Sequence, residues 1–247
     1  MSLSHGGFPS ILTSLTGSVT AYSLRRVGPY YGPLIKVRRS ADDAEQDIGV
    51  LNGQLDINSL LTFCGAGSGY ISTWYDQSGN GNHATQITTS IQPRIVNSGT
   101  VDTQNNKPAA IFTGTEYLNG PSIAWGCTFG VFKRSVITQV VSELTPGGGL
   151  NRGLFPGNAT SQYWIHNNYS VNGGELSANQ PLSAVGSALY QVTGSGLKMT
   201  SAHRIGYGSP SYTYLNGCLM ELIVYPTDIS ASRAYIEWNQ MKYYGMI

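Results

Sequence analysis

The chain has 247 residues, of which 11% are charged and 40% are hydrophobic, and its formal net charge is +1 at pH 7. An aromatic fraction of 11% is too high for a disordered chain. The net charge is too small to attract nucleic acid, so we expect no nucleic-acid partner. With 31 glycines, the composition favours short strands joined by many tight turns in one large all-β domain.

The N-terminal segment lacks the strand pattern of the rest of the chain. We predict an arm over residues 1–18 and a single domain over residues 19–247. The main apolar residues of the arm are Phe8, Ile11, Leu12 and Leu15. Exposed apolar side chains are costly in water, so we expect the arm to pack on a neighbouring subunit. The first residues do not resemble a secretory signal, and no apolar run is long enough to predict a membrane span.

Runs rich in β-branched and aromatic residues, separated by Gly, Pro and Asn, predict the strands. The predicted strands cover residues 19–24, 34–39, 69–75, 92–96, 109–113, 128–132, 136–142, 162–166, 188–193, 203–207 and 219–225. The basic residues between Arg25 and Arg39 are followed at once by an acidic run, residues 42–47, and we expect these charges to neutralise one another locally.

Two short helices are expected between the strands. Asp56 is a suitable N-cap for a helix over residues 57–63, and Gly65 is a suitable stop. A second helix is predicted from a cap at Asp228 or Ser230 to Tyr244. One face of it is expected to pack on the domain, with Ala231, Ala234, Tyr235, Trp238 and Met241 at helical spacing. The tryptophans expected in the core are Trp74, Trp125 and Trp238.

The loop after the predicted strand 69–75 holds Asp76, Ser78, Asn80 and Asn82. Such side chains commonly bond backbone amides in fixed turns, so we interpret this as a structural loop. The alternative is a Ca²⁺ site, for which a single carboxylate is a poor start. No other metal-ligand or nucleophile motif is apparent, so no metal and no cofactor are expected.

Several segments together resemble a known family. They are residues 21–25, 32–43, 74–83, 92–95, 108–118 and 220–226. They are similar to the catalytic domain of α-L-arabinofuranosidase B and to concanavalin A-like, laminin-G-like modules of phage and bacterial surface proteins. The resemblance implies a two-sheet jelly-roll sandwich of the concanavalin A-like class. It also implies a disulfide at the position of Cys64, but Gly67-Ser68-Gly69 replaces the second cysteine. The chain has three cysteines, Cys64, Cys127 and Cys218.

The carboxylates that the resemblance requires are not apparent in the sequence. A retaining glycosidase uses two carboxyl groups about 5–5.5 Å apart. The family pattern places them near residues 151–164 and in the loop 206–212, and neither stretch contains Asp or Glu. The mid-chain carboxylates Glu143 and Glu175 stand outside the motif. We therefore assign no catalytic residue and expect no hydrolysis of aryl α-L-arabinofuranosides.

Sugar-binding chemistry is nevertheless present in the sequence. Tyr or Trp beside Asn and His is typical of shallow carbohydrate sites and also of protein contacts. The candidate residues are Trp164, His166, Asn168, Tyr207 and Tyr212. We expect a non-enzymatic structural or adhesive module of a phage virion that contacts other protein subunits or surface glycans. The alternative is an extracellular arabinofuranosidase-like glycoside hydrolase or an inactive carbohydrate-binding relative.

Overall fold

The computed structural model describes residues 15–135, 142–144, 152–154, 168–172, 174–176, 189–207, 214–229 and 232–247. These residues are mainly strand, which confirms the all-β class. The strands are β1 Thr20–Ser23, β2 Ile35–Arg39, β3 Glu45–Ile48, β4 Val50–Leu51, β5 Gln54–Leu55, β6 Gly69–Trp74, β7 Ala84–Thr85, β8 Arg94–Asn97, β9 Thr100–Val101, β10 Thr103–Gln104, β11 Lys107–Pro108, β12 Ala110–Thr113, β13 Leu118–Arg134, β14 Ser142–Leu144, β15 Arg152–Leu154, β16 Asn168–Val171, β17 Gly174–Leu176, β18 Leu189–Ile205 and β19 Asn216–Tyr225. The helices are α1 Ile57–Cys64 and α2 Arg233–Tyr243, with a short 3-10 turn at Thr89–Ile91.

The strand pairing closes a ring. β13 pairs with β19, β19 with β12, β12 with β8, β8 with β6, β6 with β7, and β7 with β13 again. β18 adds to the ring along β13, β1 along β19, and β2 along β6. This closure was not predicted, since it depends on pairs far apart in sequence such as Phe129 with Ile223.

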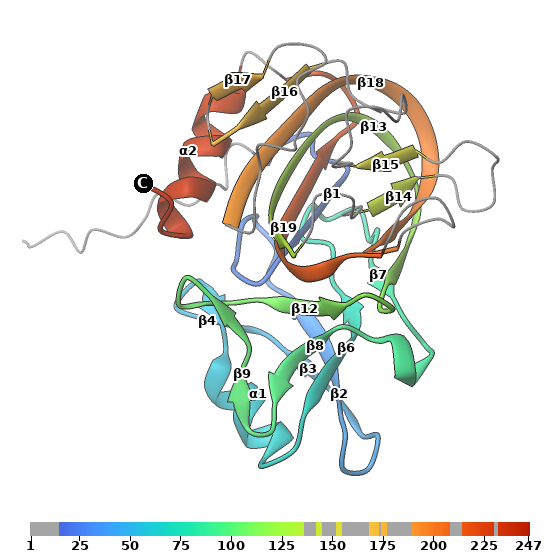
Figure 1. Cartoon of the computed structure of the whole chain (residues 1–247), viewed down its shortest axis with the longest axis vertical. Coiled ribbons are helices and arrows are strands. Elements are labelled where there is room, and N and C mark those ends of the chain that lie inside the picture. The colour runs from blue at the N-terminus through green and yellow to red at the C-terminus, as the bar shows by residue number, and fades with distance from the viewer. Residues whose placement is uncertain are drawn as a thin grey trace, which may run out of the picture.

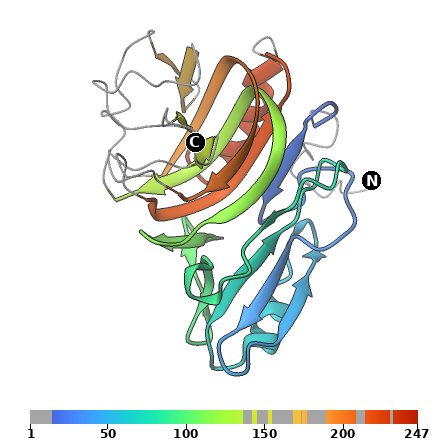
Figure 2. The same cartoon turned by 90° about the vertical axis from the view of Figure 1, so that its right-hand side faces the viewer.

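Two very long strands dominate one half of the molecule. β13 and β18 run as curved arcs beside β19, while β2, β3, β6 and β8 lie together in the other half (Figure 1). The view turned by 90° shows the same division (Figure 2). Irregularities in the β13–β18 register fall between Gly120 and Ile123 and between Trp125 and Cys127, and such bulges bend a strand. β18 contains most of the predicted strands 188–193 and 203–207 as one element.

The apolar core lies inside the ring and under α2. Trp74 and Trp125 are fully buried, as predicted. The prediction for Trp238 is wrong, because that side chain is 38% exposed, and Tyr235 on the same helix is 39% exposed. Polar residues of α2, Asn239 and Gln240 among them, are buried instead. The helix therefore joins the sheet partly through hydrogen bonds, which a purely apolar pattern does not predict.

The start of the described chain packs on the protein itself. Leu15 is 4% exposed and lies in a cluster with Val27, Phe129 and Ile236. The expectation that Leu15 packs on a neighbouring subunit is therefore wrong. The backbone N–H of Val19 donates to the carbonyl of Val224 at 2.8 Å and leads directly into β1. The other apolar arm residues, Phe8, Ile11 and Leu12, lie outside the described residues.

Local signals predicted both ends of α1 and the charge pairs, but not the start of α2. Asp56 caps α1 by accepting from the N–H of Ser59 at 3.1 Å, and Gly65 ends the helix at φ 58°. α2 begins later than predicted, with Ser232 at its N-cap. Arg38 pairs with Asp43 and Arg39 with Asp42, so these charges are neutralised locally as expected.

The remaining expectations concern the cysteines, a membrane span and two strands. Cys64, Cys127 and Cys218 are all buried and free, so the family disulfide is absent. In the described part of the chain, no helix has the length and apolar character of a membrane span. The predicted strand 162–166 and most of 136–142 lie outside the described residues.

Candidate functional site

The loop after β6 is held in place by a single buried carboxylate. Asp76 accepts through Oδ1 from the N–H groups of Ala21 (2.8 Å) and Ser78 (2.9 Å). Its Oδ2 accepts from the Ser78 hydroxyl (2.7 Å) and the Asn82 N–H (3.0 Å). Asn80 and Asn82 donate through their side-chain amides to the carbonyl of Val19. These contacts favour the structural interpretation of Asp76, Ser78, Asn80 and Asn82.

A cation would find few ligands in this loop. Both oxygens of Asp76 already accept from N–H or O–H donors, and a Ca²⁺ ion would have to displace them. Among the described residues, no group of three or more His, Cys, Asp or Glu side chains could hold a metal ion.

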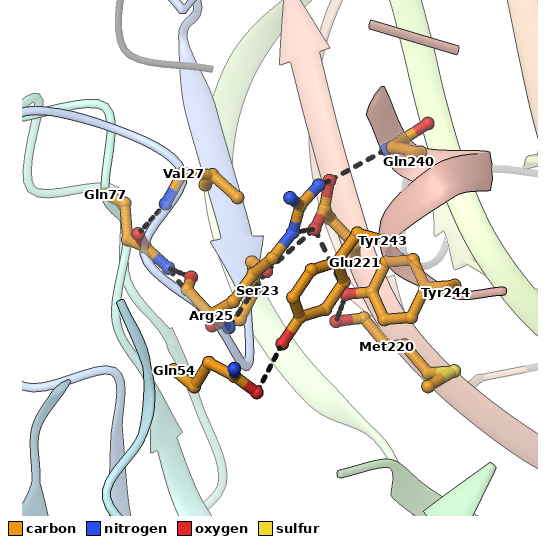
Figure 3. A network of polar contacts seen from close by, with 10 residues as sticks. All are labelled: Ser23, Arg25, Val27, Gln54, Gln77, Met220, Glu221, Gln240, Tyr243 and Tyr244. Carbon is orange, nitrogen blue, oxygen red and sulfur yellow. Dashed lines mark hydrogen bonds and ion pairs between the residues drawn. The ribbon is translucent and has the colours of Figure 1, made fainter. Parts of the chain in front are cut away.

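The next residue, Gln77, forms similar hydrogen bonds with the backbone of the segment after β1. Its amide donates to the carbonyls of Ser23 (3.0 Å) and Arg25 (2.9 Å), and its Oε1 accepts from the N–H of Val27 (2.9 Å) (Figure 3). Gln77 is fully buried. The loop therefore fixes the backbone around Arg25 as well as its own.

Arg25 belongs to a buried polar network that sequence analysis did not predict. Its guanidinium contacts both carboxylate oxygens of Glu221, with Nε–Oε2 at 2.9 Å and Nη2–Oε1 at 3.2 Å (Figure 3). Glu221 also accepts from Ser23 (2.9 Å), Gln240 (3.0 Å) and Tyr244 (3.1 Å). Burial alone would lower the pKa of Arg25, but the Glu221 carboxylate outweighs burial and raises it.

This Arg25–Glu221 network connects β1, β19 and α2. Arg25 is 5% exposed and Glu221 is fully buried. Tyr243 lies with its ring centroid 4.2 Å from the Arg25 guanidinium carbon. A carboxylate without solvent access and with its oxygens bonded to neighbours cannot reach a substrate. No local signal could have revealed the pair, since 196 positions separate the two residues.

The candidate binding site is a partly exposed cluster of tyrosines around Arg204, which we name the Tyr207 cluster. It consists of Tyr117, Arg204, Tyr207 and Tyr214. The Tyr207 ring centroid lies 5.1 Å from that of Tyr117 and 4.6 Å from that of Tyr214. The guanidinium carbon of Arg204 lies 3.2 Å from the Tyr207 centroid. All four side chains are partly exposed.

The cluster is assembled from separate chain segments at one end of β18. Tyr117 precedes β13, Arg204 lies near the end of β18, and Tyr214 precedes β19. Burial, followed by a hydrogen bond with Tyr207, raises the pKa of Tyr214 to about 12. Edge-to-face and tilted aromatic rings beside a planar cation and phenol groups offer an amphipathic surface of the kind that binds sugar rings.

The other sequence candidates do not join this cluster. Trp164, His166 and Tyr212 lie outside the described residues. Asn168 lies on β16 opposite Ser195, well along β18 from Arg204. The structure thus describes two of the five predicted sugar-binding residues and keeps their backbone positions apart.

Strand register also separates the two mid-chain carboxylates. Glu143 on β14 pairs with Arg204, which places it next to the Tyr207 cluster. Glu175 pairs with Ser170, which pairs with Thr193. The step from Thr193 to Arg204 corresponds to roughly 35 Å of extended strand. Even with the curvature of β18 (Figure 1), these backbone positions do not suit a pair of carboxyl groups about 5–5.5 Å apart.

His203 lies behind the cluster, in the core. Its Nδ1 is 3.1 Å from the carbonyl of Pro121, and its Nε2 is 3.5 Å from the Tyr22 hydroxyl. A Cβ at Gly120 would come within 2.0 Å of the imidazole, so only glycine fits there. Burial lowers the pKa of His203 to about 4, despite the contact with Pro121. The ring is therefore neutral near pH 7.

Comparison with known proteins indicates the class. The family model for the catalytic domain of α-L-arabinofuranosidase B matches residues 12–130. α-L-Arabinofuranosidase B of Aspergillus niger is 32% identical over 149 residues, which is 59% of this chain and 26% of that protein. A probable α-L-arabinofuranosidase B of Aspergillus fumigatus is 40% identical over 75 residues, 29% of this chain and 15% of that protein. This chain thus spans about a quarter or less of these relatives.

Solved structures show the same fold. A mutant GH54 α-L-arabinofuranosidase soaked with 4-nitrophenyl α-L-arabinofuranoside gives a TM-score of 0.61 at 16% identity, covering 90% of this chain and 62% of that chain. An arabinofuranosidase complexed with arabinofuranosyl-α-1,2-xylobiose gives a TM-score of 0.61 at 16% identity, covering 91% and 63%. The chain therefore resembles the catalytic domain of arabinofuranosidase B in both sequence and fold.

These findings correct the predicted function. The expectation of a non-enzymatic structural module of a phage virion is wrong, because the sequence and fold matches point to a glycoside hydrolase family. The same matches argue against the expectation that the chain is not an enzyme, and they give no support to a virion location. The lack of carboxylates at the family positions favours a non-enzymatic module, whereas the segments that resemble the family favour the hydrolase class to which the matches point.

Proposed function

We propose that this chain is an α-L-arabinofuranosidase-like glycoside hydrolase domain that acts on arabinose-containing polysaccharide. The observation that carries the proposal is the family match over residues 12–130. That segment includes the Asp76 loop and Tyr117, and therefore part of the framework of the Tyr207 cluster. Polysaccharide substrates are too large to cross a membrane, so an extracellular location belongs to the same proposal. We further propose that residues 19–247 form a single domain with the two-sheet jelly-roll sandwich of the concanavalin A-like class.

In this proposal the Tyr207 cluster binds a sugar ring, and Glu143 supplies a carboxyl group, because strand register places its backbone opposite Arg204. Retaining hydrolysis by two protein carboxylates requires a partner for Glu143. The register of β16–β18 places Glu175 far along the strand. This specific observation favours a second candidate function, an inactive relative that binds the same glycan without cleaving it.

Two measurements on the purified chain separate these functions. Release of 4-nitrophenol from 4-nitrophenyl α-L-arabinofuranoside measures cleavage, and calorimetric titration with arabinan oligosaccharides measures binding. We expect binding by the wild type and a loss of at least tenfold in affinity for Tyr207→Ala. If cleavage is detected, Glu143→Gln should abolish it, whereas Glu45→Gln on the exposed edge strand β3 should not.

The outcomes are distinct. Cleavage that depends on Glu143 supports the hydrolase, and binding without cleavage supports the inactive relative. Neither binding nor cleavage of any arabinose-containing probe would remove both functions.

A further inference from the structure

An open pocket of about 480 Å³ lies on the protein surface away from the Tyr207 cluster. Its walls come from the segment after β1, the end of β3 and the β4–β5 hairpin, and they include Arg26, Tyr30, Tyr31, Asp47 and Asn52. In Figure 1 the β4 strand lies at the left of the molecule, whereas β14, which pairs with the strand end at Arg204, lies at the right. The volume is within the range of small-molecule sites, about 300–1,000 Å³.

The backbone around this pocket is held firmly. The Gln77 side chain fixes the carbonyl of Arg25 and the N–H of Val27 at one wall. The N–H of Arg26 donates to the carbonyl of Gly53 at 2.9 Å, which ties this wall to the β4–β5 hairpin. The hairpin turn has Asn52 and Gly53 at positive φ, 52° and 79°, as expected for a tight Asn-Gly turn. A fixed backbone reduces the entropy lost on binding a ligand.

Tyr30 and Tyr31 are arranged differently within the wall. A Cβ at Gly32 would come within 2.3 Å of the Tyr30 hydroxyl, so the Tyr30 side chain folds back over Gly32. Tyr31 instead projects into solvent and is 87% exposed. Its ring lies 5.6 Å from the guanidinium carbon of Arg26. With so much of its surface exposed, the ring still has a face free for a ligand.

The polar groups of the pocket form a mixed set. Asp47 is exposed and accepts through Oδ1 from the Tyr75 hydroxyl at 2.7 Å, which orients the carboxylate. Within the described residues, no carboxylate forms an ion pair with Arg26. The pocket therefore presents an acceptor, a cationic donor and the Asn52 amide around an exposed aromatic ring.

We infer that this pocket is a second saccharide-binding site, which takes one neutral sugar unit of a polysaccharide chain. The apolar face of the sugar ring stacks on Tyr31, while its hydroxyl groups bond to Asp47, Arg26 and Asn52. A charged sugar or a phosphate is disfavoured, because Asp47 would repel an anion and Arg26 would repel a cation. The inference rests on the proposed function only for the choice of polysaccharide.

Titration of the ¹⁵N-labelled chain with arabino-oligosaccharides and with xylohexaose tests the site. We expect saturable amide shifts at Gly32, Gly49 and Gly53, which line the pocket. Tyr31→Ala should weaken these shifts about tenfold or more in apparent affinity. Ile87→Ala, which removes an apolar side chain that is 92% exposed and does not line the pocket, is the matched control and should leave the affinity unchanged.

The result separates this site from the proposed function. Shifts in the pocket amides that survive Tyr207→Ala but not Tyr31→Ala support the second site, whether or not the chain cleaves an arabinofuranoside. The inference is overturned if neither oligosaccharide shifts these amides at millimolar concentration. Equal affinities for Tyr31→Ala and the wild type would overturn it as well.

Discussion

Two clusters in this protein are built from the same kinds of side chain, an arginine and neighbouring tyrosine rings, yet their environments differ. Arg25 lies 4.2 Å from the Tyr243 ring centroid, is nearly inaccessible to solvent and shares a carboxylate with Ser23, Gln240 and Tyr244. Arg204 lies 3.2 Å from the Tyr207 ring centroid, and both side chains are partly exposed. Solvent access, rather than residue type, distinguishes a structural network such as Arg25–Glu221 from a surface available to a ligand.

The difference has an energetic meaning. A buried ion pair with complete hydrogen bonding contributes to stability mainly through what its loss would leave behind, an uncompensated charge in the core. A partly exposed aromatic cluster contributes less to folding and retains surface to bury against a ligand. The Arg25–Glu221 network should therefore respond to substitution as a folding element and the Tyr207 cluster as a binding element.

The largest effect is expected for Glu221→Gln. Glutamine keeps the volume but leaves the buried Arg25 without an opposite charge, and we expect the free energy of unfolding to fall by about 3–5 kcal/mol. Urea denaturation measures it. Asp42→Asn breaks the exposed Arg39–Asp42 pair as a control and should have little effect. An equally small effect for Glu221→Gln would show that the network does not stabilise the fold.

The Asp76 loop should behave like the Arg25–Glu221 network. Asp76→Ala removes the acceptor of the backbone N–H groups of Ala21, Ser78 and Asn82, and of the Ser78 hydroxyl. We expect a loss of about 2–4 kcal/mol in the free energy of unfolding, because unpaired buried donors are costly. Thermal and urea unfolding measure this loss. Unchanged stability with loss of glycan binding would instead assign the loop to a binding site.

His203 predicts how stability depends on pH. Its pKa is lowered to about 4 in the folded protein, whereas an unfolded chain has a His pKa of about 6.5. The unfolded state therefore binds more protons below pH 6.5, and stability should fall as the pH drops from about 6.5 towards 4, by on the order of 3 kcal/mol in total. His203→Gln should remove most of the slope between about pH 6.5 and 5. A slope that is unchanged in this variant would assign it to other groups.

Sequence reasoning succeeded where the cause of a structure is local. Asp56 caps α1, Gly65 ends it, and the Asp76 loop bonds its own backbone, all within a few residues. It failed where partners are distant. The closure of the ring depends on pairs such as Asn119 with Thr85. The exposed position of Trp238 was missed because hydrogen bonds such as that from Gln240 to Glu221, rather than apolar spacing alone, orient α2.

The candidate site was predicted only in part. Tyr207 was selected for its residue type, and the structure supplies the neighbours that make it a cluster, Tyr117 and Arg204, from other segments. Neither neighbour carries a sequence signal for sugar binding. The Arg25–Glu221 network could not be predicted from the sequence either, because a buried ion pair is recognised only when the positions of both residues in the fold are known.

The smallest effect on stability, and the sharpest test of the comparison, is expected for Tyr207→Ala. Tyr207 is partly exposed, so its removal should lower the free energy of unfolding by only about 1 kcal/mol. Its counterpart Tyr243 is 8% exposed and packs on Arg25, and Tyr243→Ala should cost about 3 kcal/mol or more. Glycan affinity should follow the opposite order, with a loss of about tenfold for Tyr207→Ala and little change for Tyr243→Ala.

Tyr207→Phe refines this prediction. Phenylalanine keeps the ring that faces Arg204 and loses only the hydroxyl that bonds to Tyr214. If ring stacking dominates binding, Tyr207→Phe should retain most of the affinity that Tyr207→Ala loses. Unfolding curves and calorimetric titration with arabinan oligosaccharides on the same preparations would measure both quantities. If Tyr207→Ala destabilised the protein as much as Tyr243→Ala and left affinity unchanged, the two clusters would have the same structural role.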